Sequence, residues 1–234
     1  MAKEDDMTKT MTGNVTASTI GAVLHSAARY DLLVWLLTLG RERVFREKVV
    51  RLARLQSGET VLDVGCGTGS LAIAAKRHVG ATGTVYGIDA SPEMLARAEK
   101  KARKASVEIV FKNAMAQALP FPDAQFDAVL TTVMLHHLPR RARQLCVTEI
   151  RRVLKPGGRV LAVDFGLAAR ERKGILAHFH RHGHVKLPDM IKLLSEAGLN
   201  TVESGAVGIR DLQFVLAVLD NHSLPPMDLR DENI

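Results

Sequence analysis

Residues 59–70 read ETVLDVGCGTGS, and this stretch decides the fold. Its apolar, β-branched first half predicts a short buried strand over Glu59–Val64. The alternate glycines Gly65, Gly67 and Gly69 let the chain turn sharply and let a ligand pack against bare main chain, because a Cβ there would collide with it. A helix is predicted to follow directly. This order is typical of a nucleotide site, whereas a merely tight turn between strand and helix is the simpler alternative.

Strands and helices alternate through the rest of the chain. Ser91 and Pro92 show how one helix should begin, with a serine N-cap and a proline at the first helical position. Pro156-Gly157-Gly158 is expected to stop a helix before the next strand. The predicted strands are 59–64, 84–88, 107–111, 126–132, 159–165, 200–207 and 212–219, and the helices between them are 71–79, 91–104, 140–154 and 187–197.

This order predicts an α/β fold. Strands that alternate with helices need right-handed crossovers, which give a parallel sheet covered on both faces. The last two strands are joined by a turn over only 208–211, so they must run antiparallel. We therefore expect a Rossmann-like, doubly wound, seven-stranded sheet that is mostly parallel with an antiparallel last strand.

Composition excludes several classes of protein. The 234 residues are 47% hydrophobic and 24% charged, which is ordinary for a globular protein and unlike a fibrous or disordered one. The longest apolar stretch, 32–39, is far shorter than the roughly 20 residues of a membrane span. The acidic N-terminus does not resemble a signal peptide, and two cysteines are too few for a disulfide framework. A cytoplasmic protein is therefore expected.

Three regions are predicted along the chain. Apolar residues recur at helical spacing over Ser18–Leu55 and predict an N-terminal helical cap over 1–56, whose start, about 1–16, is expected to be disordered. The core should occupy 57–220, and 221–234 should form a C-terminal tail.

Two carboxylates narrow the choice of ligand. Asp89 closes the second predicted strand about 20 residues after the glycine loop, where it can accept hydrogen bonds from both ribose hydroxyls. Asp63 lies just before the loop, where it suits an amino group or a sulfonium and would repel a diphosphate. The spacing GxGxG also differs from the GxGxxG of dinucleotide sites. These residues favour S-adenosylmethionine over NAD.

Four stretches together resemble a known family. They are VLDVGCGTGSLAIAA, VYGIDASPEMLARAEKKA, NAMAQALPFPDAQFDAVLTTVMLHHLP and EIRRVLKPGGRVLAVDFG, in this order and spacing. They resemble the class I S-adenosylmethionine-dependent methyltransferases, more narrowly the type 11 branch of the ubiquinone/menaquinone C-methyltransferases and many small-molecule methyltransferases. The resemblance covers about Tyr30–Leu219 and implies a seven-stranded sheet with a reversed last strand, which agrees with the expected fold.

The resemblance also implies a binding site for S-adenosylmethionine, with S-adenosylhomocysteine as product and no metal. Asp63 would lie near the amino group and Asp89 would bind the ribose. Asn113 stands where the family usually has an acidic residue for the adenine amino group, so adenine binding without charge assistance should be somewhat weaker. The other implied residues are Gly65, Cys66, Gly67 and Gly69 against the methionine part and ribose, Ala90 and Met94 beside the adenine, Ala114 next to Asn113, and Thr131 facing the cofactor.

Methyl transfer to an acceptor is an in-line displacement, so the protein mainly has to align the reactants and exclude water. A general base matters when the acceptor is a hydroxyl or a carbon acid, and histidine is the usual candidate. If His136 and His137 are extended they point in opposite directions, so at most one would face substrate, and either can instead pack against or cap the next helix. The candidate catalytic or acceptor-pocket residues are His136 after the fourth strand, His180 and His184 in a histidine-rich segment, and Tyr30 in the cap.

The distribution of charge bears on the binding partners of the protein. The net charge of +7 permits attraction to anions, and basic residues cluster over 41–54 and 97–104, either as solvated helix faces or as a peripheral contact with anionic membrane. Nucleic acid is not expected, because only 4% of residues are aromatic and Thr131-Thr132-Val133-Met134 replaces the Asn/Asp-Pro-Pro-aromatic tetrad. The histidine-rich segment lacks accompanying carboxylates or cysteines, so no metal is predicted.

The expected function is S-adenosylmethionine-dependent methyl transfer to a small, apolar or aromatic acceptor at carbon, oxygen or nitrogen. Three alternatives stay open. They are a phospholipid-headgroup N-methyltransferase, a catalytically silent cofactor-binding scaffold, and a nicotinamide oxidoreductase, which the loop spacing disfavours. The residues fix neither the acceptor nor the oligomeric state.

Overall fold

The computed structural model describes residues 42–166, 185–209 and 211–221. At its centre lies a seven-stranded sheet of order β3-β2-β1-β4-β5-β7-β6. Neighbours from β3 to β5 pair in parallel, and β7 pairs antiparallel with both β5 and β6. The strands are β1 (Thr60–Val64), β2 (Thr84–Asp89), β3 (Val110–Asn113), β4 (Phe126–Thr132), β5 (Leu154–Phe165), β6 (Leu199–Ala206) and β7 (Leu212–Leu219). The predicted fold class and the reversed last strand are confirmed.

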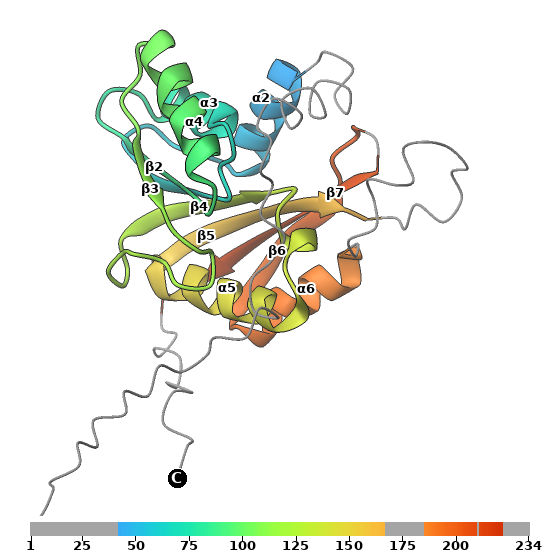
Figure 1. Ribbon diagram of the computed structural model, residues 1–234. Helices are drawn as coiled ribbons and strands as arrows, with labels where there is room; N and C mark the ends of the chain where they lie inside the picture. The colour runs from blue at the N-terminus through green and yellow to red at the C-terminus, as the bar shows by residue number, and fades with distance from the viewer. Residues whose placement is uncertain (1–41, 167–184, 210, 222–234) are drawn as a thin grey trace, which may run out of the picture.

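Helices cover both faces of the sheet (Figure 1). On one face lie α2 (Glu42–Leu52), α3 (Ser70–Val79) and α4 (Pro92–Lys104). On the other lie α5 (Arg140–Val153) and α6 (Leu187–Glu196). A short 3-10 helix, η2 (Leu135–His137), follows β4. Most of the predicted cap and almost all of the predicted tail lie outside the described residues.

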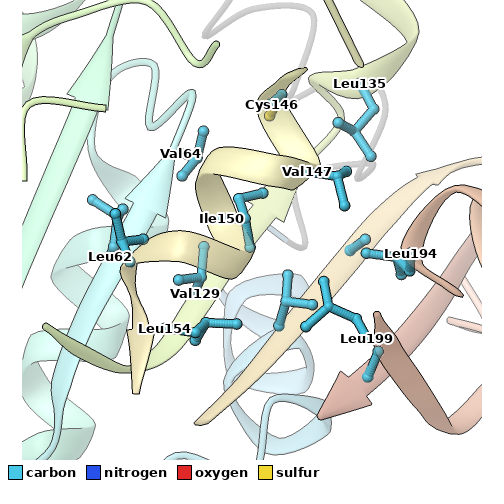
Figure 2. Close-up of a cluster of buried hydrophobic side chains, with 14 of the residues drawn as sticks. Leu62, Val64, Val129, Leu135, Cys146, Val147, Ile150, Leu154, Leu194 and Leu199 are labelled. Atoms are coloured by element: carbon cyan, nitrogen blue, oxygen red, sulfur yellow. The ribbon is translucent and has the colours of Figure 1, made fainter. Parts of the chain in front are cut away.

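The core under α5 is closely packed (Figure 2). Cys146, Val147 and Ile150 project from one side of α5 onto Val64 of β1 and Val129 of β4. All five side chains are at most 1% exposed. Burying a side chain of the size of Val or Ile stabilises a fold by roughly 1.5–3 kcal/mol, so the apolar stripe of α5 holds it across these strands.

A second core joins α2 and α3 to the opposite face of the sheet. Phe45 and Val49 of α2 and Leu71 of α3 pack with Val61 of β1 and Leu130 of β4. This packing fixes α3 directly behind the glycine loop, and it holds α2 against α3.

Local signals account for the start of α4. The hydroxyl oxygen of Ser91 accepts a hydrogen bond from the backbone N–H of Met94 at 3.4 Å, and Pro92 is the first helical residue. The predicted N-cap is therefore confirmed. This cap begins α4 immediately after Asp89 ends β2.

Two predicted strand boundaries are wrong. Strand β5 begins at Leu154 instead of Arg159, because Leu154 already pairs with Phe126 and the Pro-Gly-Gly segment forms an irregularity within the strand. Strand β3 begins at Val110 instead of Val107, because the N–H of Val107 still bonds the carbonyl of Ala102 at the end of α4. At β5 pairing with the neighbouring strand outweighs the pattern of apolar residues, and at β3 a local hydrogen bond does so.

Candidate functional site

The glycine loop lies at the carboxyl end of β1, the edge at which open α/β sheets bind ligands. The backbone N–H groups of Gly65 and Cys66 donate to the carbonyl of Ile88 at 2.9 and 2.8 Å. The N–H of Gly67 donates to Oδ2 of Asp89 at 2.9 Å. These bonds hold the glycine loop against the end of β2, so the loop and Asp89 are fixed relative to each other.

The loop requires glycine on conformational grounds. Gly65, Gly67 and Gly69 have φ angles of 72°, 54° and 77°, in the left-handed region that other residues rarely adopt. A Cβ on Gly69 would lie 2.8 Å from the Cβ of Ala98, and one on Gly65 would lie 2.5 Å from Cγ of Met134. The loop is therefore enclosed by α4 on one side and by the segment after β4 on the other.

Asp63 fits a positively charged ligand. Its side chain is 1% exposed, and neither carboxylate oxygen makes a hydrogen bond of standard geometry. Burial raises the pKa of Asp63 from 3.8 to about 7, against the opposing effect of the Arg46 guanidinium and, more weakly, of the Ala72 N–H. A buried acceptor without a partner is costly, and an ammonium group would relieve that cost. The buried carboxylate of Asp63 thus fits the amino group of S-adenosylmethionine.

Asp89 combines structural and ligand-binding capacity. Its second oxygen, Oδ1, accepts from the N–H of Ser91 at 2.9 Å. Burial raises the pKa of Asp89, and the N–H groups of Ser91, Gly67 and Ala90 act in the opposite direction. Each carboxylate oxygen has two lone pairs, so both can still accept from ligand hydroxyls.

Asn113 ends β3 beside Asp89. Its side-chain NH₂ donates to the backbone carbonyl of Asp89 at 2.9 Å, and the N–H of Ala114 approaches the same carbonyl at 3.2 Å. The bond commits the amide nitrogen and leaves the amide oxygen as an acceptor. Met94 is 2% exposed and Ala90 is half-buried at the start of α4. The residues expected around an adenine thus lie at adjoining ends of β2, β3 and α4.

Thr131 lies near the end of β4, paired with Val64 of β1. It is 1% exposed, and its hydroxyl has no hydrogen-bond partner. A buried hydroxyl without a partner at this edge is consistent with a ligand contact.

His136 and His137 are not extended. They belong to η2, and their rings lie 3.9 Å apart between centroids, so the condition under which the side chains would point in opposite directions is not met. The chain turns here because Val133 adopts a φ of 54° and donates its N–H to the carbonyl of Val163 at 2.8 Å. The turn brings Nδ1 of His136 within 2.7 Å of Oδ1 of Asp164, at the end of β5.

Two contacts of this site were not predicted. The first is the contact of Asp164, which is 0% exposed. A charged residue in the otherwise apolar run VLAVDF could have indicated such a contact, because carboxylates are rarely buried without a partner. Nζ of Lys101 in α4 donates to the hydroxyl of Thr68 in the loop at 2.7 Å and to that of Ser70 at 3.3 Å. Its place in a basic run concealed that role.

The other candidate bases, Tyr30, His180 and His184, lie outside the described residues. The described cysteines are both buried, and burial raises the pKa of Cys146 to about 12 and that of Cys66 well above its usual value. Their thiols therefore stay neutral near pH 7 and are poor nucleophiles. Within the described ranges, no helix is long and apolar enough to cross a membrane.

A groove of about 800 Å³ lies between α2, α3 and α4. Both basic segments of the sequence contribute to it, with Arg43, Arg46 and Arg51 on one side and Lys101 on the other. Arg77 of α3 also lines the groove. Segments distant in the sequence thus form one basic surface.

The sequence matches a family of methyltransferase domains over residues 61–158. It is 40% identical over 138 residues to a 2-phytyl-1,4-naphtoquinone methyltransferase of Nostoc punctiforme, covering 58% of this chain and 59% of that protein. It is 41% identical over 140 residues to a demethylmenaquinone methyltransferase of Thermus thermophilus, covering 59% and 62%. A ubiquinone/menaquinone biosynthesis C-methyltransferase of Bordetella avium is 35% identical over 155 residues, covering 66% and 60%. The chain thus spans about three fifths of the length of these relatives.

Solved structures share the fold. A SAM-dependent methyltransferase from Aquifex aeolicus superposes with a TM-score of 0.67 at 24% identity, covering 84% of this chain and 100% of that one. The [4+2]-cyclase SpnF superposes with a TM-score of 0.63 at 20% identity, covering 76% and 80%. At these identities the likeness shows the fold alone, and the cyclase illustrates that one fold supports different reactions.

The sheet order, the loop and the matched motifs define a Rossmann-like methyltransferase domain. Within that class, residues 61–158 match the methyltransferase domain family, and the chain is similar to the ubiquinone/menaquinone C-methyltransferases.

Proposed function

We propose that this protein binds S-adenosylmethionine and transfers its methyl group to a small apolar acceptor. The observation that carries the proposal is Asp63, a buried carboxylate with no hydrogen bond of standard geometry, next to a glycine loop whose Gly67 N–H donates to Asp89. Such a pair suits a ligand with a cationic end and a ribose. When bound, S-adenosylmethionine supplies a methyl group on a positively charged sulfur. This sulfur is already an activated leaving group.

The protein's own contribution is binding and alignment. Asp63 would hold the amino group, Asp89 the ribose hydroxyls and the Asn113 carbonyl the adenine amino group. Gly65, Cys66, Gly67 and Gly69 would pack against the ligand, as would the residues Ala90, Met94, Ala114 and Thr131. A pair of reactants held in line and shielded from water gains roughly 7–11 kcal/mol over free encounter.

The acceptor we propose is a quinol, the reduced form of a naphthoquinone or a related ring. The support is the similarity of the chain to a 2-phytyl-1,4-naphtoquinone methyltransferase and to a demethylmenaquinone methyltransferase. The methylated atom would then be a ring carbon. Tyr30, His180 and His184 would line the acceptor pocket, and His136 would act as the general base.

The domain boundaries enter the proposal as well. Residues 57–220 would form the catalytic core, and the helical cap over 1–56 would cover the acceptor. The tail over 221–234 has no role in it.

The basic groove would support contact with an anionic membrane that holds a lipophilic acceptor. Arg51 and Arg77 are exposed there, whereas Arg43 and Arg46 pair with Glu47 and Glu42 on α2. Each exposed basic residue near an anionic surface contributes about 1 kcal/mol. Cosedimentation with phosphatidylglycerol vesicles at low salt, but not with phosphatidylcholine vesicles, is the expected result. Arg51→Gln/Arg77→Gln should reduce it, and equal binding by both proteins contradicts the contact.

Calorimetric titration with S-adenosylhomocysteine tests the core of the proposal, with NAD as control ligand and Asp89→Ala as control protein. Binding by the wild type alone, with NAD silent, is expected. Absence of S-adenosylhomocysteine binding, or binding of NAD instead, overturns it. A panel of quinols, phenols and amines then separates a methyltransferase from a silent scaffold, which binds without turnover. Turnover of phosphatidylethanolamine in place of a quinol would favour the headgroup N-methyltransferase.

A further inference from the structure

Asp164 holds His136 by two different atoms. Its carboxylate accepts from the backbone N–H of His136 at 3.1 Å and contacts the ring Nδ1 at 2.7 Å. It also accepts from the N–H of Phe165 at 2.7 Å. Asp164 is completely buried, and the contact joins the ends of the adjacent strands β4 and β5. This edge is shared with the glycine loop, because Met134, directly before η2, packs over Gly65.

The contact decides where the imidazole carries its hydrogen. An ionised carboxylate only accepts hydrogen bonds, so Nδ1 must donate to it. In the neutral ring the lone pair then lies on Nε2. The rings of His137 and Phe165 lie 3.9 and 5.5 Å away between centroids, so the imidazole is held in orientation as well. A ring fixed in this way is prepared to accept a proton through Nε2.

We propose that Asp164 is a positioning residue that makes His136 a general base, and that the acceptor therefore carries a hydroxyl proton that must be removed. This inference rests on the proposed function and selects hydroxylated aromatic rings over amines, which are nucleophiles without a base. The hydroxyl proton passes to Nε2. A ring carbon next to the C–O group forms the new bond to the methyl carbon, while the C–S bond breaks and its electron pair stays on sulfur. The ring then releases its C–H proton to solvent, and the imidazolium returns its proton to the oxygen.

Asp164→Asn is the sharpest variant. An amide can donate to Nδ1, which moves the hydrogen to Nε2 and removes the lone pair from that nitrogen. With the quinol of 2-prenyl-1,4-naphthoquinone as probe, kcat should fall about 100-fold or more. Affinity for S-adenosylhomocysteine should not change. His136→Asn should lower kcat by the same factor. The double variant should lower kcat no further, because the two residues act as a unit.

Asp127→Asn is the matched control. Asp127 also accepts a backbone N–H, that of Thr60 at 2.8 Å, but it lies at the opposite end of the sheet. Its loss should leave kcat per folded molecule unchanged.

A readout independent of turnover is the ¹⁵N NMR spectrum of the histidine rings in the ligand-free full chain. The Nδ1–H form is expected for His136 in the wild type and the Nε2–H form in Asp164→Asn. Wild-type His136 in the Nε2–H form overturns the inference, and so does an Asp164→Asn protein that retains full turnover. If the wild type instead fails to bind S-adenosylhomocysteine while the spectrum shows Nδ1–H, the proposed function is overturned and the role of Asp164 in fixing the ring stands.

Discussion

The backbone N–H of Gly67 donates to Oδ2 of Asp89 at 2.9 Å, and Oδ1 of the same carboxylate accepts from Ser91 at 2.9 Å. One side chain thus joins the glycine loop, the end of β2 and the start of α4. Its structural role and its proposed ribose-binding role are therefore coupled, and they can be separated by comparing stability with affinity.

Asp89→Ala is expected to lower the free energy of unfolding by about 1–3 kcal/mol, because two N–H groups lose their acceptor. It should also weaken S-adenosylhomocysteine binding by about tenfold or more, since charge-assisted hydrogen bonds to the ribose are lost. Denaturant unfolding and calorimetry measure the two effects. Asp127→Ala removes a comparable acceptor far from the site, so it should lower stability alone. Full affinity in Asp89→Ala would exclude the carboxylate from the site.

Asp63 should make the ligand-free protein less stable as pH rises. Because burial raises its pKa from 3.8 to about 7, the folded protein keeps a proton there that the unfolded chain releases. The penalty is absent below the unfolded pKa of 3.8, grows through this window and is complete above about pH 7. Asp63→Asn should therefore raise the free energy of unfolding near neutral and alkaline pH by a few kcal/mol, and hardly change it at acidic pH.

The same Asp63→Asn substitution should weaken S-adenosylhomocysteine binding, since the neutral amide no longer attracts an ammonium group. Thermal unfolding at about pH 5 and about pH 8 measures the first effect, and calorimetry measures the second. A variant that is less stable than the wild type at both pH values would show that a partner already compensates the buried charge.

Gly69→Ala should lower the free energy of unfolding by about 1–3 kcal/mol, because its Cβ would lie 2.8 Å from Ala98 and 3.1 Å from Phe111 and its φ is 77°. The matched control is Gly205→Ala in β6, whose Cβ would meet Phe214 at an ordinary 3.7 Å. Equal stability of the two variants would mean that α4 moves aside freely.

Val133 is a β-branched residue at a φ of 54°, a conformation that costs roughly 1–2 kcal/mol. Val133→Gly removes this strain but gives the unfolded chain about 0.5–1 kcal/mol of extra conformational freedom. The two effects nearly cancel, so the free energy of unfolding should change by less than about 1 kcal/mol. A much larger loss in denaturant unfolding would indicate that the packing of the Val133 side chain, rather than its backbone, holds η2.

Much of the fold follows from local chemistry. The glycine loop, the Ser91-Pro92 helix start and the short turn before β7 each act within a few residues, so the sequence pattern predicts them. The start of β5 was more difficult to predict, because pairing with Phe126 across the sheet draws Leu154 into the strand despite the Pro-Gly-Gly segment.

The candidate site was predicted unevenly for the same reason. Asp63 and Asp89 are marked by their distance from the loop along the chain. The contact between His136 and Asp164 joins residues on different strands, and it depends on a backbone turn at Val133 that the sequence does not favour. Lys101 reaches Thr68 only through the packing of α4, so its run of basic residues suggested a solvated face.

The inserted position of β7 has a consequence for synthesis. Strand β5 lies between β4 and β7, yet residues 212–219 leave the ribosome well after residues 154–165. Until β7 arrives, β5 presents an unpaired apolar edge, which is a template for pairing with another nascent chain. Chains that terminate before Leu212 would therefore aggregate rather than fold, and efficient expression would depend on uninterrupted translation through the last strand.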